Sequence, residues 1–200
     1  MPDATATASA VRVLAALAVA VASGIALGLG ISLSRTLQGI FEPIIEFYRP
    51  IPPLAYLPLV VIWFGIGEFA KILVIYLSIF PSIVIATVDG LKSISQDKIH
   101  AARSMGASRF QVIGLILFPH ALPSILTGTR IGLGIGWSTL VAAELIAATS
   151  GLGFMVKGAA DFLVTDVVIL GIFVIALVSI GMELALRALQ KGIVPWQGHE

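Results

Sequence analysis

The chain has 200 residues, of which 58% are hydrophobic and 12% are charged, and its mean hydropathy of +1.05 exceeds what a soluble domain of this size can bury. The composition therefore excludes an ordinary soluble domain and predicts an all-α membrane protein. A formal net charge of +1 without runs of like charge gives no indication of nucleic-acid binding, and the absence of Cys excludes disulfides and thiolate metal sites.

A helix needs roughly 20 apolar residues to cross the bilayer, and cutting the chain at its charges gives about five candidate spans. They cover residues 13–33, 54–66, 72–88, 126–148 and 167–189. The second is short and follows Pro50, Pro52 and Pro53, so we expect a short or kinked span. Residues 151–155 are apolar but too few to cross, which favours a re-entrant or surface helix. Residues 1–200 are thus expected to form a single transmembrane domain.

The distribution of Lys and Arg predicts the orientation of these spans. If the long polar stretch at residues 92–119 is cytoplasmic, its side carries eight of them: Arg35, Arg49, Lys92, Lys98, Arg103, Arg109, Arg187 and Lys191. The other side carries three, Arg12, Lys71 and Lys157. The carboxyl terminus is then cytoplasmic, and an odd number of spans leaves the amino terminus outside. Its short polar start has no obvious means of export, so we expect a first span to be missing.

The amino-terminal apolar run is not expected to be a signal peptide. Asp3 precedes Arg12, so the positively charged start of such a peptide is missing, and the apolar run is longer than the core of about 7 to 15 residues that signal peptides have. The run is therefore interpreted as part of the first span.

The polar stretch is predicted to form two short helices joined by a glycine. Ser93 with Gln96, and Ser108 with Gln111, have the spacing of capping boxes, in which two side chains satisfy free backbone groups of a first helical turn. Gly106 lies between them and is the residue type best suited to the left-handed conformation that ends a helix. The sequence therefore predicts a rigid elbow, although an ordinary helical loop between spans would show the same local signals.

The spacing of this stretch is similar to the EAA motif of ABC importer membrane subunits. His100-Ala101-Ala102, Gly106 and Ile116-Leu117-Phe118-Pro119 match it, with His100 in place of the usual Glu and Phe118 in place of Leu. We expect the second helix to end at Pro119. The resemblance implies the type I ABC importer permease fold, with residues 92–119 as the coupling loop that a cytoplasmic ATP-binding subunit holds. The residues implied in that contact are His100, Ala101, Ala102, Gly106, Ile116 and Pro119.

Further segments resemble the permease branch for taurine, alkanesulfonates and nitrate. They are residues 49–53, 63–67, 130–137 and 151–153, and residues 137–148 with Pro195-Trp196 look most like taurine permeases. The resemblance implies a permease subunit of the bacterial inner membrane that imports taurine or another organosulfonate. The implied partners are an ATP-binding subunit, a periplasmic substrate-binding protein, a second copy of the chain and membrane lipid. Members of this branch usually have six spans, one more than is visible here.

Other functions remain open at this point. The substrate of such a permease could instead be nitrate, cyanate or a pyrimidine precursor. A secondary transporter or channel would need no ATPase, but it would be expected to carry more charge inside its spans. An inactive truncated fragment is the third alternative.

Two features inside the spans are candidates for packing or transport. Gly128, Gly132 and Gly136 form a small-residue ladder that suits close helix packing, either within the chain or at a homodimer seam. Glu144 is a carboxylate well inside a span, where it needs water or a partner. With Trp137, Ser138 and Arg130 it is a candidate for the translocation path, and the alternative is a structural hydrogen bond to a neighbouring helix.

The sequence gives no sign of an enzyme. It contains no Gly-x-x-x-x-Gly-Lys-[Ser/Thr] loop to hold ATP phosphates, so ATP hydrolysis is expected in another chain. The three His residues and the scattered carboxylates lack metal-ligand spacing, and no nucleophile and base are paired. We therefore expect no catalytic residue, metal or cofactor.

Overall fold

The computed structural model describes residues 2–147 and 150–195, and among these every regular element is helical. In chain order the elements are α1 Pro2–Leu33, α2 Arg35–Tyr48, η1 Pro53–Tyr56, α3 Leu57–Phe64, α4 Glu68–Lys92, α5 Gln96–Ser104, α6 Arg109–Val112, the π-turn η2 Ile113–Leu117, α7 Phe118–Ala147, α8 Leu152–Asp161 and α9 Thr165–Ile193. The predicted all-α fold is confirmed. Residue 148, at the end of one predicted span, and Trp196 lie outside the described residues.

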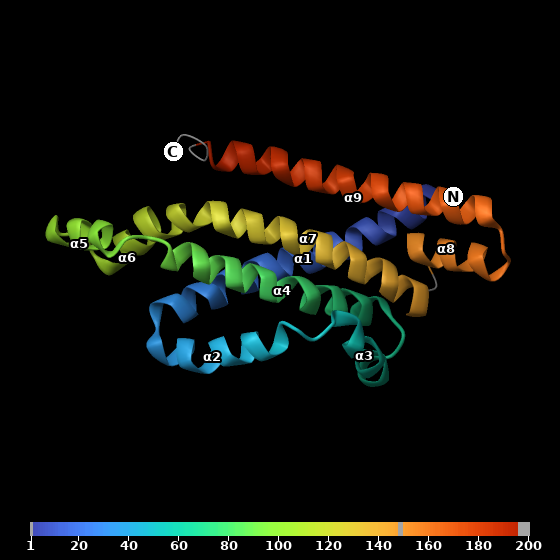
Figure 1. The fold of residues 1–200 in the computed structure, drawn as a ribbon, viewed down its shortest axis with the longest axis horizontal. Coiled ribbons are helices and arrows are strands. Elements are labelled where there is room, and N and C mark those ends of the chain that lie inside the picture. Colours follow the sequence, from blue (N-terminus) through green and yellow to red (C-terminus); the bar gives the residue numbers. More distant parts are fainter. Residues whose placement is uncertain (1, 148–149, 196–200) are drawn as a thin grey trace.

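Three long helices, α1, α4 and α7, form the core of the bundle, and α4 packs against both of the others (Figure 1). The buried side chains of α4 include Ile75, Ile79 and Ile83, which pack among apolar residues of α1 and α7. Four helices are long and apolar enough to cross a membrane, and a fifth crossing is possible if a bent pair counts as one span. The prediction of about five spans is therefore confirmed.

The second predicted span is short and follows a sharp bend, in agreement with the prediction of a short or kinked span. α3 has only eight residues, too few to cross alone, and residues 54–66 are therefore not a complete span. The bent pair joins α2 to the η1–α3 segment at an angle of 93°. Pro50, Pro52 and Pro53 occupy this break and remove the backbone donors that a continuous helix would need.

The carboxyl-terminal part consists of α8 and α9, which lie along one side of the core (Figure 1). α8 has ten residues, as expected for a segment too short to cross. α9 is long and apolar, and Gly171 is its one buried residue. A Cβ added there would overlap Val156 of α8, so glycine permits the two helices to touch. Further along, Val174, Val178 and Met182 of α9 pack against the core.

The two ends of the bundle carry different structures. α5 and α6 lie at one end, together with the carboxyl end of α9, and the amino terminus lies toward the other (Figure 1). We call the first end the elbow end. Arg49 belongs to neither end, because α2 carries it back from the elbow end to the level of Leu77 in the middle of α4. Its predicted place in a loop on the same side as Arg35 is therefore wrong. Without Arg49, the side that carries the polar stretch has seven Lys and Arg residues, against three on the other side.

Candidate functional site

The polar stretch forms an elbow, here residues 92–119, whose turn is made at Gly106. This residue has φ +87°, in the left-handed region that favours glycine. The N–H of Gly106 donates to the carbonyl of Arg103 at 3.0 Å, and the N–H of Ala107 donates to that of Ala102 at 3.1 Å. These two bonds are the Schellman pattern that ends α5. A Cβ at Gly106 would meet no atom within 4 Å, so the backbone conformation, not space, requires glycine.

Only one of the two predicted capping boxes forms. The N–H of Gln111 donates to Ser108 Oγ at 3.3 Å, and the N–H of Ser108 donates to Gln111 Oε1 at 2.8 Å. The Ser93–Gln96 box is wrong. Ser93 still has helical angles, φ −71° and ψ −14°, at the end of α4, and its hydroxyl donates to the carbonyl of Gly90 at 2.9 Å. An N-cap needs an extended backbone, which Ser93 lacks because it completes the helix before it.

The second helix of the elbow does not end at Pro119, as the sequence predicted. α6, the π-turn and α7 form one helical segment from Arg109 to Ile146. In the π-turn the N–H of Phe118 donates to the carbonyl of Ile113, one residue further back than in an α-helix. This wide turn directly precedes the proline, where the ladder loses a donor. As a result the elbow is joined to α7 without a flexible link.

The residues of the EAA-like motif lie on two sides of the elbow. His100, Ala101 and Gly106 are exposed, Ile116 and Pro119 are half-buried, and Ala102 is buried. Ala102 belongs to an apolar cluster with residues of α7, including Ala121 and Ile125. Its small side chain therefore lets α5 pack on the body of the protein, whereas Ala101 faces outward.

Two large apolar side chains project from the elbow into open space. Met105 is 82% exposed and Phe110 is 87% exposed, and they flank Gly106 in the sequence. Exposed basic residues surround them: Lys98, Arg103 and Arg109. A rigid, apolar and basic protrusion of this kind is suited to insertion into a groove of a protein partner.

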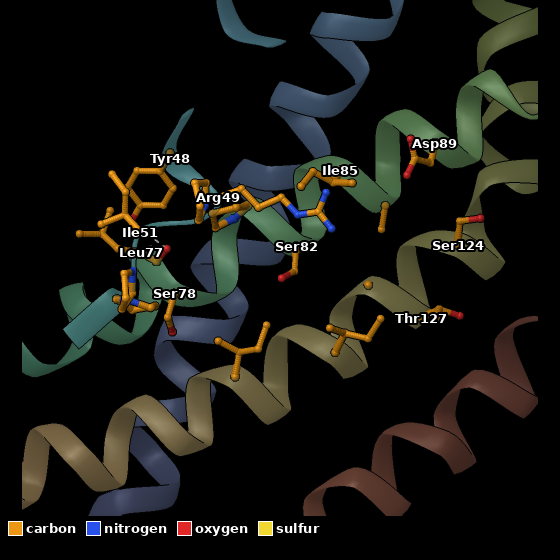
Figure 2. A pocket seen from close by; sticks show the side chains of 18 of the residues that line it. Tyr48, Arg49, Ile51, Leu77, Ser78, Ser82, Ile85, Asp89, Ser124 and Thr127 are labelled. Carbon is orange, nitrogen blue, oxygen red and sulfur yellow. Dashed lines mark hydrogen bonds between the residues drawn. The ribbon is translucent and has the colours of Figure 1, made fainter. Parts of the chain in front are cut away.

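A cavity of about 660 Å³ opens between α4, α7 and the break after α2. Figure 2 shows Arg49 pointing from this break toward Ser82 and Ile85 of α4. Asp89 is the other charged residue of the lining. Hydroxyl groups line the wall at Ser78, Ser82, Ser124 and Thr127. The α4 and α7 walls of the cavity thus combine hydroxyl groups with apolar side chains, and the lining contains one group of each charge.

The backbone that presents Arg49 is tied to the middle of α4. Tyr48 donates its hydroxyl hydrogen to the carbonyl of Leu77 at 3.1 Å. That carbonyl would normally accept the N–H four residues later, but position 81 is proline and has no N–H. Tyr48 also stacks on Tyr56, with ring centroids 5.3 Å apart. The proline in α4 therefore creates the acceptor that fixes the end of α2.

A second cluster surrounds Glu144 at the end of the bundle opposite the elbow. Glu144 is fully buried and accepts hydrogen bonds from Ser9 Oγ at 2.7 Å, Arg12 Nη1 at 2.7 Å and the N–H of Gly153 at 2.8 Å. Arg12 also donates to Glu68 Oε1 at 2.7 Å. The cluster joins α1, α4, α7 and the start of α8, and it corresponds to the structural role that the sequence left open for Glu144.

The glycines at 151 and 153 explain why the backbone can wrap around this carboxylate. Gly151 has φ +125° and a Cβ there would overlap the Glu144 carboxyl group. A Cβ on Gly153 would lie 2.7 Å from the carbonyl oxygen of Val141. Both positions therefore exclude larger residues, and the Gly-Leu-Gly segment acts as a cradle for Glu144.

The four residues suggested for the path are not brought together. Arg130 donates to Glu183 of α9 at 3.2 Å, toward the elbow end. Trp137 is buried in the α1–α4–α7 core, where its indole N–H finds no acceptor among the described residues. Ser138 is exposed on α7, one turn beyond the cavity-lining Ile135. Their roles in a path stay predictions, and none of the four lines the cavity.

The glycine ladder of α7 faces α4. A Cβ on Gly128 would overlap Ala86, one on Gly132 would lie 2.9 Å from Ile79 Cγ2, and one on Gly136 would lie 2.5 Å from Ile79 Cδ1. The ladder is therefore used for packing within the chain, and it brings the α4 and α7 walls of the cavity close together.

Residues 20–195 match the family described as binding-protein-dependent transport system inner membrane component. The chain belongs to this family. It is 63% identical over 166 residues to the taurine transport system permease protein TauC of Escherichia coli K12, covering 83% of this chain and 60% of that protein. It is 38% identical to the putative aliphatic sulfonates transport permease protein SsuC of the same organism, covering 82% and 62%. This family member thus spans about three fifths of the length of these relatives.

Solved structures confirm the type I importer permease fold for this family member. A structure described as an amino acid ABC transporter with histidines aligns with a TM-score of 0.75 at 17% identity, covering 96% of this chain and 92% of that one. An inward-facing MetNI methionine ABC transporter aligns with a TM-score of 0.69 at 20% identity, covering 94% and 95%. At sequence identities of 17% and 20%, the similarity to these two structures shows a shared fold and does not extend to their substrates.

Sequence reasoning missed two residues that the fold makes prominent. Arg49 was counted as a loop charge, although the prolines after it signal a break that can present a side chain inward. Arg12 was placed just outside the first span, yet it is 3% exposed and binds Glu144. Opposite charges at the same end of two apolar segments are a signal that could have paired them.

Proposed function

We propose that this chain is the membrane-spanning permease subunit of an ATP-driven importer that carries taurine or a related organosulfonate across the cytoplasmic membrane. The observation that carries the proposal is the 63% identity to a taurine permease in a chain whose elbow is exposed and rigid. A permease of this kind forms the passage, and ATP hydrolysis occurs in a separate subunit. In this proposal the permease subunit is therefore not itself an enzyme.

The elbow supports docking to a cytoplasmic ATP-binding subunit. Burying Met105 and Phe110 in a partner groove would remove two exposed apolar side chains from water, which favours association. Because α6 continues into α7 through the π-turn, movement of the elbow would be transmitted to a core helix. The elbow end, with the carboxyl terminus, would accordingly face the cytoplasm, in agreement with the excess of Lys and Arg there.

The other partners follow from the same proposal. A periplasmic binding protein would deliver substrate at the end opposite the elbow. A second copy of the chain would complete the passage, and lipid would cover the exposed apolar faces of α9, where Ile172, Phe173 and Leu177 are each more than half exposed.

Nitrate is the second candidate substrate, because the nitrate import permease protein NrtB of Synechocystis is 34% identical to this chain. A carrier that works without an ATPase is the alternative of another class. The apolar protrusion of the elbow would have no evident use in such a carrier.

Co-purification tests the partner directly. Phe110→Asp should abolish recovery of the ATP-binding subunit with the tagged chain, because a charge replaces an apolar contact. Phe162→Asp is the matched control, since Phe162 is also exposed, at 82%, but follows α8 at the opposite end. Equal recovery with both variants would refute docking through the elbow.

A further inference from the structure

The cavity is lined by a cation, Arg49, at mid-depth in the bundle. The side chain points toward Ser82, close to the centre of α4, which runs from Glu68 to Lys92. Its backbone is held by the Tyr48 hydroxyl bond to α4 and by its own N–H bond to the carbonyl of Ile45 at 2.9 Å. The backbone of Arg49 is therefore held in place, which limits the positions that its side chain can reach and lowers the cost of ordering it around a small ligand.

No described residue forms an ion pair with the Arg49 guanidinium or with the Asp89 carboxylate. The hydroxyls of Ser82 and Ser124 also make no hydrogen bond within the described part of the chain. The Arg49 charge, at mid-depth, is costly unless it meets water, a partner or a ligand, and such charges mark the routes of substrates. The cavity thus offers the free hydroxyl of Ser82 beside the Arg49 cation, and a free carboxylate at Asp89 further along α4.

The two charges lie at different heights along one face of α4. Arg49 points toward Ser82 and Ile85, which lie seven and four residues before Asp89, or about 10 Å and 6 Å along a helix. Two charged hydrogen bonds of about 3 Å each leave up to about 4 Å for the ligand itself. That length suits an anion and an ammonium group joined by a two-carbon spacer.

We propose that this cavity binds the transported molecule as a zwitterion, with Arg49 and Ser82 holding the sulfonate and Asp89 with Ser124 holding the ammonium group. The proposal rests on the proposed function and adds the residues and the ligand charge pattern. It distinguishes aminosulfonates from plain alkanesulfonates and nitrate, which have nothing to offer Asp89. A guanidinium suits a sulfonate because its planar donors can bind two oxygens at once.

A single-cysteine experiment tests the cavity, because the chain has no Cys. Ile131 lines the cavity and is 57% exposed, whereas Ile169 on α9 is 51% exposed and outside it. In the assembled transporter in nanodiscs, taurine should slow the reaction of Ile131→Cys with the neutral reagent methyl methanethiosulfonate. The same taurine should leave Ile169→Cys unaffected.

Two charge variants, combined with Ile131→Cys, identify the contacts. Arg49→Gln should raise the taurine concentration needed for half-protection by about ten- to a hundredfold, as expected for loss of a charge-assisted contact. Arg35→Gln, at the other end of α2, should leave it unchanged. Ethanesulfonate, which lacks the ammonium group, should protect less well than taurine in the parent, and Asp89→Asn should remove that difference.

The outcomes separate this proposal from the proposed function. Two outcomes would overturn the cavity assignment but leave the permease function standing, provided that taurine uptake still depends on ATP. In the first, taurine protects Ile131→Cys from the reagent equally well when Arg49→Gln is added. In the second, taurine does not protect Ile131→Cys at all. A disulfide between two copies through Ile131→Cys, with no effect of taurine on its formation, would show that the cavity is a subunit contact and would also overturn the assignment. Failure of the parent to take up taurine would contradict the proposed function itself.

Discussion

Replacing Glu144 by Ala should strongly destabilise the folded chain. The carboxylate is fully buried and accepts three hydrogen bonds, so its loss leaves Arg12 buried with Glu68 as its remaining carboxylate partner. Breaking a buried ion pair costs about 3–5 kcal/mol. For a chain of this size 1 kcal/mol shifts the melting temperature by about 2–4 °C. The expected decrease is therefore about 6–20 °C.

Thermal unfolding in detergent, followed by the loss of helical circular dichroism, measures this decrease. Asp161→Ala is the matched control, because Asp161 pairs with Lys157 at a side-chain exposure of 59% and exposed pairs contribute about 0–1 kcal/mol. A Glu144→Ala variant that melts within the range of this control would refute the structural role of the cluster, and the path role would regain support.

Three glycine variants follow from the same geometry. Gly106→Val should reduce ATP-coupled transport while leaving membrane insertion intact, because a left-handed conformation costs an ordinary residue about 1–2 kcal/mol. Gly106→Asn, the control, should retain most of the transport activity. Equal uptake by the two variants would contradict this prediction. Gly151→Ala should lower the melting temperature by displacing the Glu144 carboxylate, and an unchanged melting curve would count against the cradle. Gly128→Leu should destabilise the chain by about 1–3 kcal/mol through overpacking against Ala86, measured by SDS-induced unfolding, with the exposed Gly134→Leu expected to be nearly neutral.

The helical spans and the elbow turn could be predicted because their causes are local. Long apolar runs define α1, α4, α7 and α9 whatever their neighbours, and Gly106 needs only the chain beside it to adopt its conformation. The Ser108 capping box likewise depends on residues three positions apart. The Ser93 box failed because the spacing cannot show that the preceding helix continues through Ser93.

The candidate site could be predicted only in part, because it depends on distant pairings. Arg12 and Glu144 are 132 positions apart, and no local pattern reports that they meet. The level of Arg49 depends on α2 folding back along α4, which follows from the bond between Tyr48 and the carbonyl that Pro81 leaves free. Hydropathy described this region as a short span and could not reveal a cavity beside it.

ATP-driven uptake is the most direct test of the account. The chain should be reconstituted in liposomes with its ATP-binding subunit and binding protein, and radiolabelled taurine should be followed with ATP or with a non-hydrolysable analogue on the elbow side. The account predicts uptake that requires ATP hydrolysis and is lost in Phe110→Asp. Taurine flux that proceeds equally without ATP would contradict it.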